Sequence, residues 1–309
     1  MGVEISVVLP AYNEAENLVE VDPAICIEQA KLDRTYEVIV VDDGSTDATP
    51  SVVADLRAAH PAMRYVRLRR NFGKSAALSV GFNRIEGEIV VLMDADGQDD
   101  PTEISTLLAA LDGGLDQVTG SRAGHRNDRF IKRNTSKVYN GVTARVTGVS
   151  GRDFNSGFKA MRRPVTDSLE MYGELHRYIP VLAQWAGFRV GEVPVRHHPR
   201  LHGSTKFGRA RFWRGFLDLF TVKFLTTYTS RPFHLFGGIG VIFGVIGSVL
   251  LSWMAFSKAM GHDIGTRPIL QVGVLLVVVA VQLITLGLIA ELIIHTRKAR
   301  GPEDFADEP

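Results

Sequence analysis

Two long stretches of this 309-residue chain contain no Asp, Glu, Lys or Arg. They run from Phe233 to Phe256 and from Pro268 to Ala290, whereas residues 1–231 carry nearly all of the charge. Each stretch is longer than the ~20 residues that cross a ~30 Å hydrocarbon layer as a helix. The sequence therefore predicts two transmembrane helices after a charged domain. A buried helical hairpin in a soluble protein is the alternative.

Basic residues lie outside the two apolar stretches. They are Arg209, Arg211, Arg214, Lys223 and Arg231 before the first stretch, and Arg297, Lys298 and Arg300 after the second. The loop between them, 257–267, has only Lys258 and Arg267. Because cytoplasmic loops carry an excess of Lys and Arg, we expect both chain termini and the charged domain to lie in the cytoplasm. Residues 212–229 mix aromatic and charged side chains, which predicts an amphipathic helix at the membrane surface.

Short runs of Val, Ile and Leu recur through the charged domain, each followed by polar residues and a helix-like segment. The runs that predict strands are 4–9, 36–41, 65–68, 89–93, 117–119 and 188–196. Continuous apolar strands separated by helices are typical of an α/β fold with a mainly parallel sheet covered on both faces. Ligands bind at the carboxyl ends of such strands, so the loops at Pro10, Asp42 and Asp94 should meet at one edge. Within the first helix, over 15–32, Pro23 predicts a break or kink.

The loop after the fourth predicted strand holds four carboxylates within seven residues, which repel one another unless a cation holds them. They are Asp94, Asp96, Asp99 and Asp100. Asp94, Asp96 and Gln98 alternate, so an extended backbone would turn their oxygen atoms to one side, as a hard divalent ion requires. Asp99 and Asp100 also fit a simpler role as polar caps of the next helix.

The three loops together offer the groups that bind a nucleotide. Tyr12 presents an aromatic face to a base, and Asp43 can accept hydrogen bonds from ring nitrogens or ribose. A metal at Asp94 and Asp96 can neutralise a diphosphate. Glu14 either contacts the base or begins the following helix. The sequence contains neither G-x-G-x-x-G nor G-x-x-x-x-G-K-[ST], so diphosphate binding would depend on the metal and on basic side chains.

Six motifs follow one another along the chain. They are PAYNEAEN at 10–17, VDDGSTD at 41–47, NFGK at 71–74, MDADGQDDP at 93–101, GSR at 120–122 and FNSGFK at 154–159. With the two apolar stretches, this combination resembles family 2 of the GT-A glycosyltransferases. Within that family it is similar to the polyprenyl-phosphate glycosyltransferases, such as dolichyl-phosphate mannose synthase and the bacterial undecaprenyl-phosphate glucosyl- and aminoarabinosyl-transferases. The resemblance covers essentially the whole chain.

The resemblance implies an architecture and a reaction. We expect a cytoplasmic GT-A (Rossmann-like) domain over 1–207, an amphipathic juxtamembrane segment over 208–231, a two-helix transmembrane hairpin over 232–297 and a cytoplasmic tail over 298–309. The enzyme would move one sugar, with inversion, from a nucleoside diphosphate sugar to polyprenyl phosphate. The reaction would take place at the cytoplasmic face of a bacterial plasma membrane and would give a lipid-linked monosaccharide.

The resemblance also implies which residues do this. Asp94, Asp96 and Gln98 would hold Mg²⁺ or Mn²⁺. The nucleotide-sugar site would comprise Pro10, Tyr12, Glu14, Asp43, Lys74, Asp94, Ala95, Arg200 and Lys206, and the catalytic set would be Asp96, Asp153, Arg200 and Lys206. Arg200 and Lys206 would close over the diphosphate on a glycine-hinged loop, and a basic loop beside the membrane is the alternative reading.

A basic segment follows the GSR motif. Arg129, Lys132, Arg133 and Ser136 fall on one face of a helix if this segment is helical. A solvated basic face is one reading, and a clamp for an acceptor phosphate made by Arg122, Arg133 and Ser136 is the other. Asp153 is expected beside the acceptor. Because a phosphate acceptor is already ionised near pH 7, Asp153 is not required as a general base, and its role stays open.

Two other functions fit the sequence less well. A processive polysaccharide synthase is disfavoured because the Q-x-x-R-W motif of those relatives is absent. A non-catalytic nucleotide-sugar-binding scaffold is disfavoured because Asp94, Asp96, Gln98, Arg200 and Lys206 are all present. The net charge of +1 gives no reason to expect a nucleic acid partner.

Two features bear on assembly and on other sites. The spacing of Gly237, Gly240, Gly244 and Gly247 predicts a closely packed helix interface, within one subunit or between several. The resemblance favours a homo-oligomer, with a tetramer preferred. The single Cys26 excludes internal disulfides and a cysteine-ligated zinc site.

Overall fold

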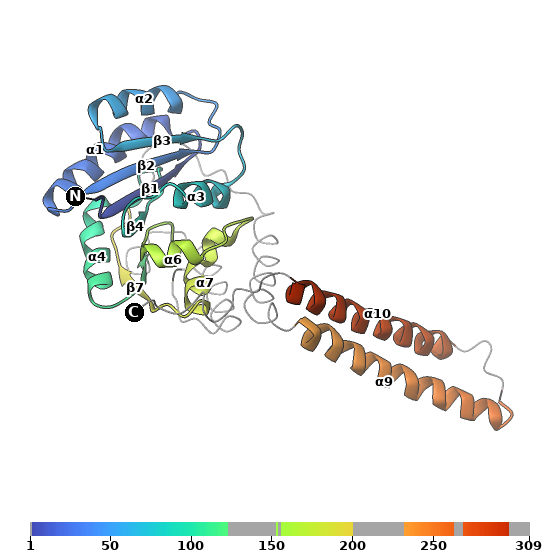
Figure 1. Cartoon of the computed structure of the whole chain (residues 1–309). Helices are drawn as coiled ribbons and strands as arrows, with labels where there is room; N and C mark the ends of the chain where they lie inside the picture. Colours follow the sequence, from blue (N-terminus) through green and yellow to red (C-terminus); the bar gives the residue numbers. More distant parts are fainter. Residues whose placement is uncertain (1, 123–152, 154–155, 200–231, 263–267, 297–309) are drawn as a thin grey trace. The chain divides into compact units, whose positions relative to one another are not determined.

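The computed structural model describes residues 2–122, 153, 156–199, 232–262 and 268–296. The chain divides into two compact units, Met1–Val222 and Lys223–Pro309 (Figure 1). The predicted juxtamembrane segment and C-terminal tail lie outside the described residues.

The first unit is built on a seven-stranded sheet in the order β3-β2-β1-β4-β6-β5-β7. The strands are β1 (Ile5–Ala11), β2 (Tyr36–Asp42), β3 (Met63–Arg67), β4 (Ile89–Leu92), β5 (Gln117–Ser121), β6 (Lys159–Arg162) and β7 (Val190–Pro194). Neighbouring strands are parallel except at β6, which runs antiparallel to both β4 and β5. The mainly parallel sheet is confirmed, and so are the six predicted strands.

The sequence did not predict strand β6. It has four residues, and both of its end residues, Lys159 and Arg162, are charged, so no apolar run marks it. Its direction matters for the site, because its first residue pairs with the last residue of β4. Lys159 lies opposite Leu92 at the end of β4 and opposite Thr119 in β5. The antiparallel strand therefore brings the end of the FNSGFK motif to the carboxyl end of β4.

Helices cover both faces of the sheet. One layer consists of α1 (Ala15–Lys31), α2 (Thr49–Ala59) and α4 (Ile104–Asp112), and the other of α3 (Lys74–Phe82), α6 (Arg163–Ser168) and α7 (Ile179–Trp185). Short 3₁₀ turns, η1 (Pro101–Glu103) and η2 (Leu175–Tyr178), precede α4 and α7. Successive residues of a strand enter opposite cores: Val7 and Leu9 pack in the first layer, and Val8 in the second. This alternation explains why the strands read as continuous apolar runs.

Helix α1 passes through Pro23 without interruption, so the expected break is wrong. A proline inside a helix removes the hydrogen bond to the carbonyl four residues earlier, here that of Val19. Val19 is on the exposed side of the helix, where water can replace the missing donor. The rest of α1 is held by the burial of Leu18, Val21 and Ile25.

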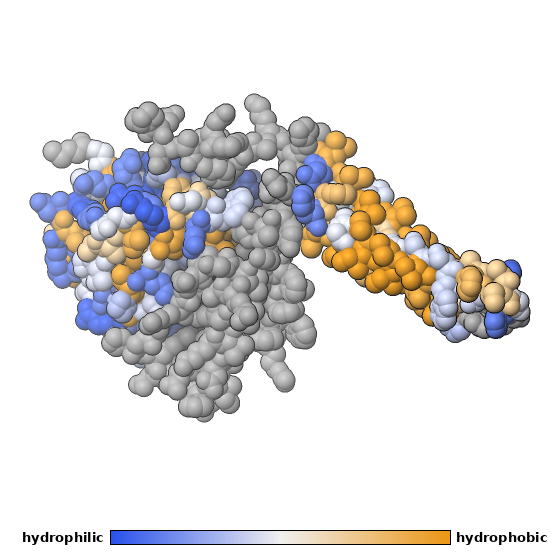
Figure 2. Space-filling view, turned by 90° about the horizontal axis from the view of Figure 1, so that it is seen from below, coloured by the Kyte–Doolittle hydropathy of each residue, from blue (hydrophilic) through white to orange (hydrophobic). Residues whose placement is uncertain are grey.

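The second unit contains two long helices, α9 (Pro232–Ala259) and α10 (Pro268–Thr296). Both are long and apolar enough to cross a membrane, with a mean hydropathy of 2.2 and 2.8 over 18 residues. Figure 2 shows hydrophobic side chains spread over the visible surface of this pair. Only 17% of each apolar window is buried, unlike a core helix of a soluble protein.

The predicted glycine interface lies between these two helices. A Cβ on Gly240 would lie 2.8 Å from Ile284 Cγ1, and one on Gly247 would lie 3.0 Å from the carbonyl oxygen of Gly273. The close helix packing is thus confirmed within one chain. Glu291 of α10 accepts a hydrogen bond from the backbone N–H of Phe233 at 3.2 Å. It therefore satisfies a donor that the first turn of α9 leaves without a helical partner.

Candidate functional site

The loops after β1, β2 and β4 meet at one edge of the sheet, as predicted. These strands are neighbours and parallel, so their carboxyl ends lie together. The backbone N–H of Asp43 donates to the carbonyl of Ala11 at 2.8 Å. Asn13, with a φ of 56°, donates its N–H to Ser45 Oγ at 2.9 Å and accepts from the N–H of Thr46 at 2.8 Å. Backbone and side-chain contacts therefore join the first two loops.

Pro10, Tyr12 and Glu14 lie in or directly after β1. Pro10 is tolerated in a central strand because β1 pairs with β4 only as far as Val8, so no ladder bond is lost on that side. Tyr12 is half-buried. Glu14 occupies the N-terminal capping position of α1, and its carboxylate accepts from Asn17 Nδ2. Of the two expectations for Glu14, the start of the helix is confirmed.

Asp43 holds the NFGK loop. Its Oδ1 accepts from the backbone N–H of Phe72 at 2.7 Å, and its Oδ2 accepts from that of Gly73 at 2.9 Å. Burial raises the pKa of Asp43 above its usual value, against the lowering effect of these two hydrogen bonds. The loop leads directly into α3, so Asp43 fixes the place at which Lys74 begins that helix.

The loop after β4 forms a turn at Ala95 and Asp96, and Gly97 has a φ of 71°. The extended backbone expected for 94–98 is therefore wrong. Two carboxylates fold the loop back on itself: Asp99 Oδ2 accepts from the N–H of Asp94 at 3.1 Å, and Asp96 Oδ1 accepts from the N–H of Gln98 at 3.2 Å. Ala95 is buried, with 2% of its surface exposed.

The structure separates the roles of the four carboxylates. Asp100 caps η1, with Oδ1 accepting from the N–H of Thr102 at 3.0 Å and from its hydroxyl at 2.6 Å. The capping role expected for Asp100 is confirmed. Asp99 holds the loop through the N–H of Asp94, as described above. Asp94 differs from these two because its carboxylate forms an ion pair with the ammonium of Lys74.

Gly157 and Lys74 shape the surroundings of Asp94. A Cβ on Gly157 would lie 2.4 Å from Asp94 Oδ2, so only glycine leaves room for this carboxylate. Burial alone would raise the pKa of Asp94, but attraction to Lys74 outweighs it and holds the pKa below its usual value. Asp94 is therefore ionised and is held by a lysine that a bound cation can replace.

Two basic side chains beside Asp94 were missed as individual site residues. Lys159 is buried and donates to the carbonyl of Ser156. Burial, with repulsion from Lys74, lowers its pKa to about 8. His176 in η2 has Nδ1 3.0 Å from Ser75 Oγ, and burial with the nearby Lys74 lowers its pKa well below its usual value. Lys159 ends the FNSGFK motif and could have been singled out there, whereas no sequence signal marked His176.

Arg122 and Asp153, predicted separately, form one ion pair. Arg122 Nε donates to Asp153 Oδ2 at 2.7 Å, and Nη2 donates to Oδ1 at 3.1 Å. Burial opposes the charge on Arg122, but Asp153 outweighs burial and raises the pKa of Arg122. The backbone N–H of Asp153 donates to Glu192 Oε1 at 3.1 Å, which anchors the pair to β7. A fork-shaped pair of this kind gives both partners a fixed orientation.

The segment after β7 runs beside the loop after β4. His197 forms an isolated antiparallel bridge with Asp99, and the N–H of His198 donates to the carbonyl of Gln98 at 2.8 Å. The side-chain Nε2 of Gln98 lies 3.5 Å from the carbonyl of His198. Arg200 and Lys206 follow this segment in the sequence but lie outside the described residues, as do Arg133 and Ser136.

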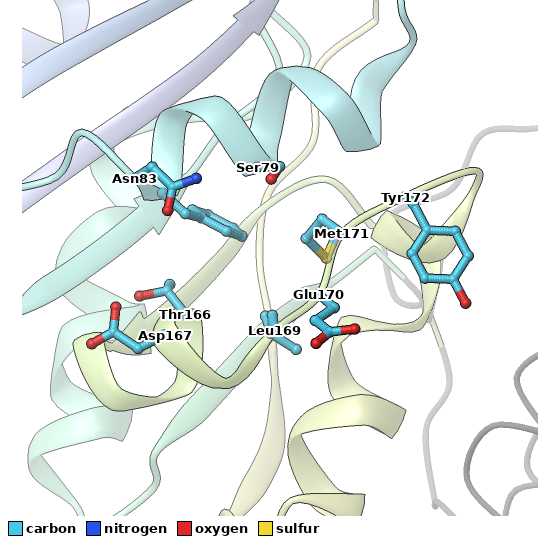
Figure 3. A pocket seen from close by; sticks show the side chains of 9 residues that line it. Ser79, Asn83, Thr166, Asp167, Leu169, Glu170, Met171 and Tyr172 are labelled. Atoms are coloured by element: carbon cyan, nitrogen blue, oxygen red, sulfur yellow. The ribbon is translucent and has the colours of Figure 1, made fainter. Parts of the chain in front are cut away.

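A pocket of about 390 Å³ lies at the other end of α3 (Figure 3). It is lined by Ser79 and Phe82 of α3 and by Asn83, which follows that helix, by Thr166 and Asp167 of α6, and by residues 169–172. Lys74 and Ser75 are at the opposite end of the helix. None of the predicted site residues that the structure describes lines this pocket, so it is separate from the edge that holds Asp94 and Asp96.

Chemically, the edge offers the Asp94 carboxylate close to the cationic side chains Lys74, Lys159 and Arg122, with Asp96 two residues further along the same loop. Carboxylate oxygens are the donors that Mg²⁺ and Mn²⁺ prefer, and the Asp94 side chain keeps 36% of its surface exposed. Such a mixture of charges can hold an anion together with a divalent cation.

Comparison with known proteins identifies the family. The model of glycosyl transferase family 2 matches residues 6–169, which include the loops after β1, β2 and β4. The chain is a family 2 glycosyltransferase. The glycosyltransferase is 36% identical over 300 residues to the dodecaprenyl-phosphate galacturonate synthase of Rhizobium johnstonii, covering 96% of this chain and 89% of the relative. It is 33% identical to the undecaprenyl-phosphate 4-deoxy-4-formamido-L-arabinose transferase of Edwardsiella ictaluri, covering 94% and 88%.

A solved structure supports the fold of the glycosyltransferase. The mannosyltransferase PcManGT from Pyrobaculum calidifontis, in complex with GDP-Man and Mn²⁺, superposes with a TM-score of 0.50 at 20% identity. The match covers 95% of this chain and 75% of that one. The GT-A fold expected from the sequence is therefore confirmed.

Proposed function

We propose that this glycosyltransferase moves one sugar from a nucleoside diphosphate sugar to a polyprenyl phosphate, with inversion at the anomeric carbon. The carrying observation is the placement of Asp94 and Asp96 at the carboxyl end of β4, beside Lys74, Lys159 and Arg122. The acceptor is inferred from the two relatives named above, which match almost the whole chain, and from the apolar helices α9 and α10.

Asp94, Asp96 and Gln98 would hold Mg²⁺ or Mn²⁺, which supplies positive charge to the departing nucleoside diphosphate. Their oxygen donors fit such an ion, and the Asp94 side chain is 36% exposed. Lys74 would help to neutralise the negative charge of the donor diphosphate. Arg200 and Lys206 would supply further positive charge from the segment that follows His198. The nucleoside would lie along Pro10, Tyr12 and Asp43.

The transfer requires no protein nucleophile. An oxygen of the acceptor phosphate attacks the anomeric carbon as the bond from that carbon to the diphosphate oxygen breaks, and the bonding electrons leave with the nucleoside diphosphate. A single in-line displacement inverts the configuration. Because the acceptor is already an anion, Asp153 is not needed as a base. Its two hydrogen bonds instead orient Arg122 towards the acceptor phosphate, with Arg133 and Ser136 completing the clamp.

We further propose a topology with the catalytic domain and both chain termini in the cytoplasm of a bacterial cell. Basic residues on the outer flanks of α9 and α10 support it, because such residues are retained on the cytoplasmic side. A homo-oligomer, with a tetramer favoured, stays a prediction. The close packing of α9 on α10 accounts for the glycines within one chain.

The test is transfer from a panel of labelled nucleoside diphosphate sugars, uronic acid donors included, to undecaprenyl phosphate by the purified full chain. We expect one lipid-linked monosaccharide from one donor, lost on chelation by EDTA and in Asp96→Ala. Asp55→Ala, on the exposed surface of α2, is the matched control and should keep activity. A ladder of products would indicate a processive synthase, and bound nucleotide without transfer from any donor would contradict the proposal.

A further inference from the structure

A second group of metal-binding side chains lies away from the site at Asp94. Asp22 and Cys26 of α1 meet His60, which follows α2. Because β3 begins at Met63, His60 lies towards the amino ends of the strands, at the edge opposite the nucleotide loops. The three ligand atoms lie within 4.8 Å of one another. Neither the proposed reaction nor the packing of the sheet uses this group.

The contacts have the pattern of a metal site. Asp22 and Cys26 are four residues apart and therefore project from the same side of α1. Cys26 Sγ lies 3.9 Å from Asp22 Oδ1, and His60 Nδ1 contacts Asp22 Oδ2. Ligand atoms of a tetrahedral zinc site lie roughly 3–4 Å apart, since each is about 2.0–2.3 Å from the ion. Small side-chain rotations would bring the three atoms to such positions around one ion.

Burial supports a cation at this place. The side chain of Asp22 is completely buried, and an isolated buried carboxylate is strongly unfavourable. Its partner His60 carries a charge only when protonated. The His60 side chain is 29% exposed and Cys26 is half-buried, so an ion held here would still be reached by water as a fourth ligand. A divalent ion would compensate the buried carboxylate at any pH at which the ligands are deprotonated.

We propose that Asp22, Cys26 and His60 bind a transition metal ion, of the zinc class, that joins α1 to the connection between α2 and β3. A thiolate and an imidazole favour Zn²⁺ over the harder Mg²⁺ or Mn²⁺, so this site and the carboxylate site would select different ions. The proposal departs from the sequence-based exclusion of a cysteine-ligated zinc site. That exclusion concerns sets of several cysteines, whereas here one thiolate would share the ion with two other ligand types.

The first test is zinc binding by the full chain, purified in detergent without a histidine tag and kept in excess Mg²⁺. We expect one tightly held zinc per chain by mass spectrometry of the metal content. Cys26→Ser and His60→Gln should weaken binding by at least about tenfold, as loss of even an indirect ligand partner does. His262→Gln, in the exposed segment after α9, and Asp96→Asn should bind zinc as the unmodified chain does.

The second test needs no variant and so does not depend on variants that fold. Co²⁺ added to the unmodified chain should produce a thiolate-to-cobalt charge-transfer absorption, because Cys26 is the chain's only cysteine. Addition of Zn²⁺ should remove that absorption. Absence of the band, absence of tightly bound zinc, or zinc binding lost in Asp96→Asn but kept in Cys26→Ser would each overturn the proposal.

Discussion

The loops after β2 and β4 are both rich in aspartates, yet they use them differently. At the end of β2 and in the loop after it, Asp42, Asp43 and Asp47 all accept hydrogen bonds from backbone N–H groups. In the loop after β4, Asp96, Asp99 and Asp100 do the same, but Asp94 is paired with the ammonium of Lys74. A carboxylate that holds backbone amides belongs to the scaffold. A carboxylate held by one flexible cation can exchange that cation for another.

The strongest test of this difference is Asp94→Asn. The variant keeps the size of the side chain and removes its charge, so the fold should persist while metal binding is lost. We expect the transfer rate to fall by about 10²–10³-fold, as loss of a group that stabilises transition-state charge does. The rate of lipid-linked product formation measures it, with thermal unfolding as the control. Unchanged transfer would remove the loop after β4 from catalysis.

Lys159, beneath Asp94, should make stability depend on pH. Its pKa is about 8 when folded and 10.5 as the ordinary value, so between these values the unfolded chain binds the additional proton. The free energy of unfolding should therefore rise as pH increases from about 8 to about 10.5, by at most about 3 kcal/mol. Below pH 8 both states hold the proton, so Lys159 should cause no change of stability with pH there. The measurement is equilibrium unfolding of the full chain against Lys159→Met. Equal slopes in the two proteins would contradict it.

Gly157→Ala tests how closely the Asp94 carboxylate is positioned. The added Cβ would lie 2.4 Å from Asp94 Oδ2, so the carboxylate must move away. A displacement of about 1 Å at a reacting group costs on the order of 10²-fold in rate, and we expect a loss of that size. Gly238→Ala in α9 is the matched control, because no atom lies within 4 Å of its Cβ. A rate equal to that of the control would show that Asp94 tolerates the shift.

Asp43→Asn should have the smallest effect and should act on stability. The amide keeps one acceptor oxygen, so one of the N–H groups of Phe72 and Gly73 loses its partner. We expect a loss of about 1–2 kcal/mol in unfolding free energy. Asp55→Asn, exposed on α2, is the control. If stability is kept while nucleotide affinity falls, Asp43 contacts the nucleotide directly, as the sequence suggests. Asp43 would then be a binding residue and not only a residue that holds the backbone.

Local patterns in the sequence determined much of the fold. Runs of Val and Ile predicted six strands and a mainly parallel sheet, in which the carboxyl ends of the strands bring the loops at Pro10, Asp42 and Asp94 to one edge. Charge-free stretches predicted α9 and α10. These features could be predicted because apolar periodicity and length reflect burial of each element by itself.

Tertiary structure decided the rest, because it depends on residues far apart in the chain. Antiparallel β6 has no strong pattern of its own, yet its direction places Gly157 against Asp94 and buries Lys159. The pairing of Arg122 with Asp153, and the meeting of Cys26 with His60, join residues more than 30 positions apart. Sequence motifs identified the charged residues of the site. Only the packed sheet determined which carboxylates accept hydrogen bonds from backbone N–H groups and which one pairs with a lysine that a bound cation can replace.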